Sequence, residues 1–141
     1  MKKLFNTGTP DWLLDLVVLA ARLATGGMML THGWPKLEKL MAGGEISFSD
    51  PIGLGPAASL ILVVFAEFFC SIFIMMGLGT RIAAIAPIVT MCVAAFVVHA
   101  PDPLRRKETA LLYLALYLIL LVTGSRKYSV DRLLFGKVRQ T

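Results

Sequence analysis

Four long apolar segments limit what this chain of 141 residues can fold into, and they lie at residues 12–33, 56–78, 82–99 and 109–123. A helix needs roughly 20 mainly apolar residues to cross the hydrocarbon core of a bilayer, and each segment reaches or approaches that length. The composition agrees, since 57% of the residues are apolar and the mean hydropathy is +0.75. Soluble domains are about 45–50% apolar. We therefore predict an all-α, polytopic membrane protein, a single domain of residues 1–141 built as a four-transmembrane-helix bundle.

The net charge of +5 does not indicate a nucleic-acid-binding protein. The basic residues flank the apolar segments instead of forming one patch, and no zinc-binding or base-reading motif accompanies them. Cytoplasmic loops of membrane proteins carry an excess of lysine and arginine. With four spans both termini lie on one side, and that side collects most of the basic residues, namely Lys2, Lys3, Arg81, Arg126, Lys127, Arg132, Lys137 and Arg139. We therefore expect a multi-pass protein of the cell inner membrane, with the lipid bilayer around it and both termini in the cytoplasm.

Two segments outside the apolar runs have distinctive compositions. Residues 42–56 are rich in Gly, Pro, Ser and Asp but include Ile46 and Phe48, so either a lid that folds back or a plain linker is expected. The C-terminal tail combines Leu133, Leu134 and Phe135 with basic residues. That composition is typical of a short amphipathic helix at the membrane interface.

Two charges of opposite sign, Arg22 and Glu67, lie near the middle of the first and second apolar segments. An unpaired charge at the centre of a bilayer costs about 3 to more than 10 kcal/mol. Because consecutive spans run antiparallel, a rise of about 1.5 Å per residue puts both side chains near mid-membrane. We therefore expect them to pair, either as a structural ion pair between helices or as a functional polar site.

A second set of polar residues gathers on the side away from the termini, and it consists of His32, Lys36, His99 and Glu108. On the fourth segment, Tyr113 and Tyr117 lie one helical turn apart, with Tyr117 near mid-depth. Two histidines and a carboxylate could bind a metal or haem, or relay protons to a quinone. The sequence lacks the His-x-x-His spacing of metal sites, so we expect no metal.

In this order, the residues resemble the DoxX family of small four-span membrane proteins. The features that carry the resemblance are a first-span pattern of Arg, Gly, His-Gly and Lys, a second-span glutamate followed by Gly-Leu-x-Thr-Arg, a histidine that closes the third span, a glutamate that opens the fourth, and Tyr-Ser-x-Asp. The matching residues are Arg22, Gly26, His32, Gly33, Lys36, Glu67, Gly77, Leu78, Thr80, Arg81, His99, Glu108, Tyr128, Ser129 and Asp131. They extend over nearly the whole chain.

The resemblance implies redox work at a membrane, since one relative belongs to a thiosulfate:quinone oxidoreductase. We therefore expect a subunit of a quinone-linked membrane oxidoreductase, with a quinone as cofactor and a redox partner protein or a second copy of the chain as partner. In this hypothesis the catalytic residues are Arg22, Glu67, His99 and Glu108, and the cofactor-binding residues are His32, Lys36, Tyr113 and Tyr117. The alternative is a non-enzymatic bundle, either transporter-like or a scaffold, because the chain contains no complete catalytic set.

Overall fold

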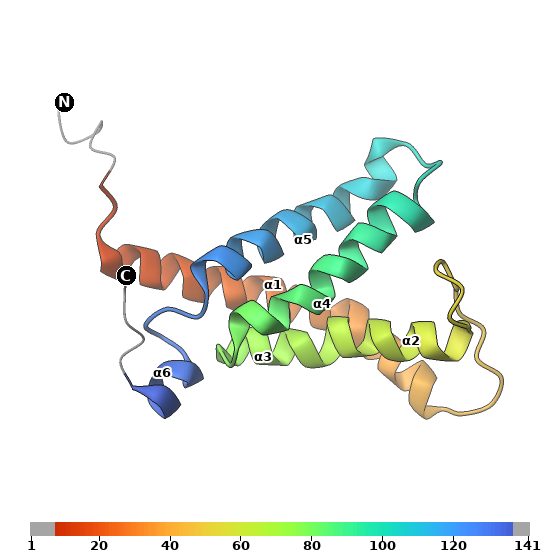
Figure 1. The fold of residues 1–141 in the computed structure, drawn as a ribbon, viewed down its shortest axis with the longest axis horizontal. Coiled ribbons are helices and arrows are strands. Elements are labelled where there is room, and N and C mark those ends of the chain that lie inside the picture. Colours follow the sequence, from red (N-terminus) through yellow and green to blue (C-terminus); the bar gives the residue numbers. More distant parts are fainter. Residues whose placement is uncertain (1–7, 137–141) are drawn as a thin grey trace.

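The computed structural model describes residues 8–136, and every regular element within them is a helix (Figure 1). The all-α prediction is therefore confirmed. Three helical stretches in this part of the chain, Asp11–Met41, Pro56–Met76 and Thr80–Val98, are long and apolar enough to cross a membrane. Large apolar side chains such as Ile82 and Phe96 are more than half exposed. An extended apolar surface of this kind is typical of contact with lipid.

The first span is longer than the sequence predicted. α1 runs from Asp11 to Met41, so the expected end near Gly33 is wrong. Pro35 lies inside the helix, where it removes one backbone hydrogen bond without ending the helix. Two residues before it, Gly33 lies directly against the backbone of Glu67. The two additional turns place Lys36 on the same continuous helix as Arg22.

The second span is one continuous helix with a wider turn in its middle. α2 (Pro56–Val64) passes into η2 (Phe65–Phe69), a π-helical segment, and then into α3 (Cys70–Met76), within two residues of the predicted span 56–78. Such π-helical turns frequently occur at functional sites. Here the turn contains Glu67. The apolar pattern of the sequence did not predict a π-helical turn at this position.

The third and fourth apolar segments form a second antiparallel pair. α4 (Thr80–Val93) continues as η3 (Ala94–Val98), and α5 (Leu104–Thr123) returns alongside it (Figure 1). The first turns of α5 carry several charges, so its uncharged part, residues 109–123, rises only about 22 Å. The hydrocarbon core is roughly 30 Å thick. The fourth span therefore stays a prediction.

Small residues allow the two helical pairs to pack closely. α1 lies along α2, η2 and α3, while α4 contacts α3 as well as α5. Ala83, Ala84, Ala95 and Ala110 belong to the same buried cluster as Tyr117. Small side chains let membrane helices approach one another, which is the main source of their packing energy in lipid.

The loop and the tail lie at opposite ends of the bundle (Figure 1). In the loop, the Asp50 carboxylate accepts hydrogen bonds from the amides of Gly55 and Leu54 and from the Ser59 hydroxyl. These bonds, that of Gly55 first, lower the pKa of Asp50 and attach the loop to the start of α2.

The tail forms a six-residue helix, α6 (Val130–Phe135), in which the Ser129 hydroxyl accepts from the Arg132 amide. The interfacial position of the tail stays a prediction. Four basic residues on which the predicted orientation rests, Lys2, Lys3, Lys137 and Arg139, lie outside the described residues.

Candidate functional site

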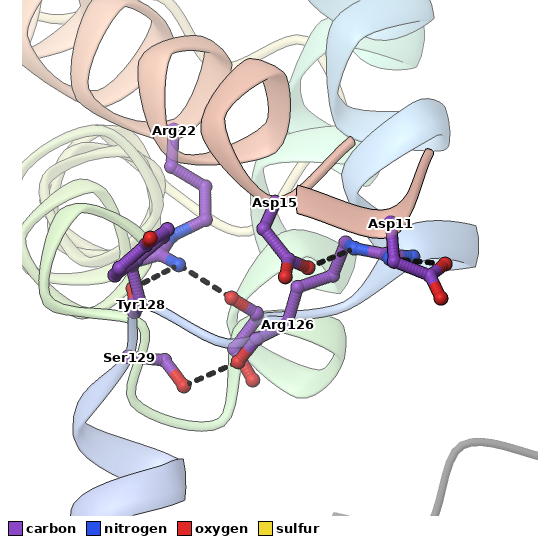
Figure 2. A network of polar contacts seen from close by, with 7 residues as sticks. Asp11, Asp15, Arg22, Arg126, Tyr128 and Ser129 are labelled. Atoms are coloured by element: carbon purple, nitrogen blue, oxygen red, sulfur yellow. Dashed lines mark hydrogen bonds and ion pairs between the residues drawn. The ribbon is translucent and has the colours of Figure 1, made fainter. Parts of the chain in front are cut away.

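Arg22 is fully buried, with 1% of its surface exposed, and carbonyl oxygens hold its guanidinium. At the end of α3, Nε donates to the carbonyl of Ile74 at 2.9 Å and Nη2 to that of Met75 at 3.0 Å. Nη1 donates to the carbonyls of Ser125 at 2.6 Å and Tyr128 at 2.8 Å, both in the tail (Figure 2). The side chain therefore joins α1, α3 and the segment after α5.

The expected ion pair between Arg22 and Glu67 is wrong, because the two residues lie at different levels of the bundle. Gly33 is the residue of α1 beside Glu67, since a Cβ there would lie 2.8 Å from the Glu67 carbonyl oxygen. Arg22 is instead level with Gly77, where a Cβ would lie 2.5 Å from Nη2 of Arg22. From Arg22 to Gly33 the helix rises about 16 Å. The register between α1 and the second span therefore differs from the predicted one. A first helix that ended at Gly33 would have brought Arg22 level with Glu67, but α1 continues to Met41.

Further ion pairs and hydrogen bonds fix the tail against the helices. Arg126 Nε lies 2.7 Å from a carboxylate oxygen of Asp15, and Asp11 lies 3.6 Å from the Arg126 guanidinium (Figure 2). Arg126 has a φ of 52°, a left-handed conformation that costs about 1–2 kcal/mol in a residue other than glycine. Asp131 accepts from the Gly79 amide and from the Ser125 hydroxyl.

Asp15, Arg126 and Asp131 were not among the site residues predicted from the sequence. The Tyr-Ser-x-Asp motif at Tyr128–Asp131 was a signal for Asp131 alone. Together with Arg22, these three residues form a structural anchor, and we call the set of Arg22, Asp15, Arg126 and Asp131 the tail anchor.

Glu67 pairs with Lys36, not with Arg22. Lys36 Nζ lies 2.5 Å from Oε2 of Glu67. The lysine side chain is 30% exposed and the glutamate side chain 5%, so the pair connects the interior of the bundle with its surface. The Ser71 hydroxyl donates to the Glu67 carbonyl at 2.7 Å, which satisfies a backbone group of the π-helical turn.

Two tyrosines of α5 lie close enough to Glu67 to interact with its charge. The rings of Tyr113 and Tyr117 are stacked, with 6.2 Å between their centroids, and His32 meets Tyr113 edge-on at 6.0 Å. Tyr117 is completely buried near Ser71, whose hydroxyl donates to the Glu67 carbonyl, and the Tyr117 hydroxyl makes no close hydrogen bond within the described residues. A buried hydroxyl without a partner costs about 1–3 kcal/mol, so a ligand oxygen at this position would be stabilising.

His99 and Glu108 lie apart from the ion pair of Lys36 and Glu67. Neither of them makes a hydrogen bond or an ion pair with Lys36 or Glu67. The His99 ring lies 2.7 Å from the carboxylate of Asp102, and Arg106 lies 3.5 Å from the same group. The hydrogen bond from His99 is the main cause of a lowered pKa of Asp102. Glu108 is exposed on the first turns of α5.

The structure therefore brings together five of the eight predicted site residues, Glu67, Lys36, His32, Tyr113 and Tyr117, which we call the Glu67 site. Arg22, His99 and Glu108 are elsewhere. Within residues 8–136 there is no group of three or more histidine, cysteine, aspartate or glutamate side chains that could hold a metal ion. The Glu67 site offers a cation, a carboxylate and an unpartnered phenol to a ligand with oxygen acceptors.

A family model described as DoxX matches residues 17–100. The inner membrane protein YqjF of Escherichia coli (strain K12) is 29% identical over 131 residues, which cover 89% of this chain and 97% of that protein. No solved structure matches.

Proposed function

This chain belongs to the DoxX family of integral membrane proteins, and from that premise we propose that it is the quinone-handling subunit of a membrane oxidoreductase. The observation that supports the proposal most is the Glu67 site. There a buried carboxylate and a partly exposed ammonium group lie beside a phenol whose hydroxyl has no partner. Ionisable groups inside membrane proteins are functional candidates by default.

A quinone fits this donor set. Its two carbonyl oxygens are acceptors that need hydrogen-bond donors, and the Tyr117 hydroxyl and the Lys36 ammonium group are such donors. The flat ring suits the stacked phenol rings of Tyr113 and Tyr117, because aromatic rings pack well in offset stacks. When bound, a quinone would supply an acceptor for two electrons and two protons.

The protein residues then bind, orient and move protons. Lys36 and Tyr117 orient the head group through hydrogen bonds, and Glu67 exchanges a proton at its carboxylate. Because the Lys36 side chain is 30% exposed, it connects that carboxylate with the bundle surface, from which protons are replaced. The electrons come from a partner, because two cysteines are too few for an iron–sulfur cluster held by four thiolates. A redox partner protein is therefore part of the proposal.

We also infer the membrane arrangement that goes with this function. The protein lies in the cell inner membrane, α5 is the fourth span, and both termini are cytoplasmic. The inner-membrane name of the Escherichia coli relative and the basic residues before α1 and after α5 support this arrangement.

Quinone binding can be measured through Trp34, which lies 5.9 Å from Phe68, the neighbour of Glu67. In a Trp12→Phe background, a short-chain ubiquinone analogue should quench the Trp34 fluorescence saturably. Glu67→Gln should weaken binding by about tenfold or more, because it removes the charged hydrogen bond that holds Lys36, a donor to the head group, in place, and such a bond contributes about 1.5–3 kcal/mol. Glu38→Gln is the matched control, since Glu38 is exposed on α1, the helix that carries Lys36 and Trp34.

Equal quenching of the parent and of Glu67→Gln would contradict a role of Glu67 in binding. No saturable quenching at all, together with movement of a solute across liposomes, would favour the transporter-like alternative.

A further inference from the structure

A cleft of about 780 Å³ lies where the first turn of α4, the end of α5 and α6 meet. This is the end of the bundle that carries the tail anchor, opposite the loop (Figure 1). Four basic residues line the cleft, Arg81, Arg126, Lys127 and Arg132. They carry more charge than the two acidic residues that line it, Asp11 and Asp131.

Both carboxylates are already engaged. Asp131 accepts from the Gly79 amide and the Ser125 hydroxyl, and Asp11 lies 3.6 Å from Arg126. In contrast, no carboxylate of residues 8–136 lies within 4 Å of Arg81, Lys127 or Arg132, all of which are exposed. Three cations of the cleft therefore have no ion-pair partner among residues 8–136, and they outnumber the one carboxylate there, Asp131, that is not paired with a cation.

The walls of the cleft are apolar as well as basic. Ile82 at the start of α4 and Val122 at the end of α5 line it and are 78% and 74% exposed, and Phe135 of α6 is 75% exposed. Ile82 lies on a candidate span, so this wall continues into the apolar outer surface of the bundle. A small hydrophilic anion would leave these side chains uncovered, whereas a molecule with an anionic head and apolar chains would cover them.

We propose that this cleft binds an anionic phospholipid, with its phosphate among Arg81, Lys127 and Arg132 and its acyl chains along Ile82 and Val122. Basic side chains at the end of a span attract anionic lipids, and each contributes on the order of a fivefold gain in affinity. The site is independent of the proposed quinone site, because it lies at the other end of the bundle. The bound lipid would bridge α4, α5 and α6, so it would hold the tail against the membrane surface.

The test uses the full chain, purified in an uncharged detergent, and native mass spectrometry to measure binding. The probes are dioctanoyl phosphatidylglycerol, dioctanoyl phosphatidylcholine and inorganic phosphate. The parent should bind phosphatidylglycerol most tightly. The double variant Lys127→Gln with Arg132→Gln should bind it about 25-fold more weakly, since two cations are lost. Arg105→Gln with Arg106→Gln, at the opposite end of the bundle, removes the same charge and should leave the affinity unchanged.

A third variant separates the head from the chains. Ile82→Ser removes part of the apolar wall along the acyl chains, so it should weaken phosphatidylglycerol binding. It keeps every cation, so the weak binding of inorganic phosphate should be unchanged. Three outcomes would overturn the proposal. These are equal affinities for the two lipids, inorganic phosphate that displaces phosphatidylglycerol at equal concentration, and a loss in the Arg105 and Arg106 control as large as that in the cleft variant.

Discussion

The tail anchor and the Glu67 site both contain a buried charge, but the two charges are stabilised in different ways. Arg22 donates to four backbone carbonyls that belong to α3 and to the tail, and no carboxylate of the described residues pairs with it. Glu67 pairs with one side chain, Lys36, whose ammonium group reaches the surface. Carbonyl partners cannot change protonation, whereas a carboxylate and an ammonium group can exchange protons.

The difference gives the tail anchor a structural role, whereas the proposed function rests on the Glu67 site. The hydrogen bonds of Arg22 join segments far apart in the sequence, and those to the tail are visible in Figure 2. The tail anchor is therefore suited to stability. The Glu67 site lies on a π-helical turn and beside a phenol without a partner. Such unsatisfied or distorted features cost stability and are retained where a ligand or a reaction uses them.

The largest expected effect comes from Arg22→Met. The change leaves four carbonyls without their donor, and since each buried unpaired group costs about 1–3 kcal/mol, unfolding should become easier by at least about 3 kcal/mol. Denaturant titration in detergent measures this, and limited proteolysis after Arg126 reports release of the tail. Arg22→Lys should recover only part of the stability, because an ammonium group lacks the planar fork. Full stability of Arg22→Met would remove the distinction between the two regions.

A smaller loss is expected from Gly33→Ala, which tests the contact that sets the register of α1. A Cβ at Gly33 would lie 2.8 Å from the carbonyl carbon of Glu67, and backbone cannot move aside as a side chain can. The overpacking should cost about 1–3 kcal/mol and weaken quinone binding with it. Gly27→Ala is the control, since a Cβ there meets nothing within 4 Å, and this change should be neutral or slightly stabilising. Equal results for both glycines would contradict the register.

Double-mutant cycles compare the two regions directly. Lys36→Met and Glu67→Leu should be coupled by about 1–2 kcal/mol, so that the double variant is more stable than the sum of the single changes predicts. Arg22→Met and Glu67→Leu should be additive within about 0.5 kcal/mol, because the residues share no partner. Unfolding of all the variants in the same detergent provides both couplings. A large coupling between Arg22 and Glu67 would contradict the structure, because it would indicate an ion pair between these two residues.

The smallest effect concerns Asp102, which belongs to neither region. Its pKa is lowered from 3.8 mainly by the hydrogen bond from His99. A carboxylate with a lowered pKa stabilises the folded state above its unfolded pKa, and this contribution is lost as the pH falls through the folded-state pKa. Asp102→Asn should therefore lose stability less steeply than the parent as the pH falls below 3.8. Midpoints of unfolding measured as a function of pH test this, and equal slopes for the parent and Asp102→Asn would contradict it.

Features that depend on local composition could be predicted from the amino-acid pattern alone. A run of apolar residues makes a helix in lipid whatever its neighbours are, so three spans were predicted near their observed positions. The sequence also identified Lys36, Glu67, Tyr113 and Tyr117 as candidates, because polar residues in or beside apolar segments are unusual.

Only the tertiary structure decided which of these residues meet. The partner of a buried charge depends on the register between two helices, and that register depends on where α1 ends and on the contact of Gly33 with the backbone of Glu67. The π-helical turn likewise depends on packing, because its wider hydrogen bonding is less stable in an isolated helix. Arg22 found its partners among carbonyls more than fifty residues away, and backbone carbonyls are the same in every residue type. No residue pattern can therefore indicate them before the chain is folded.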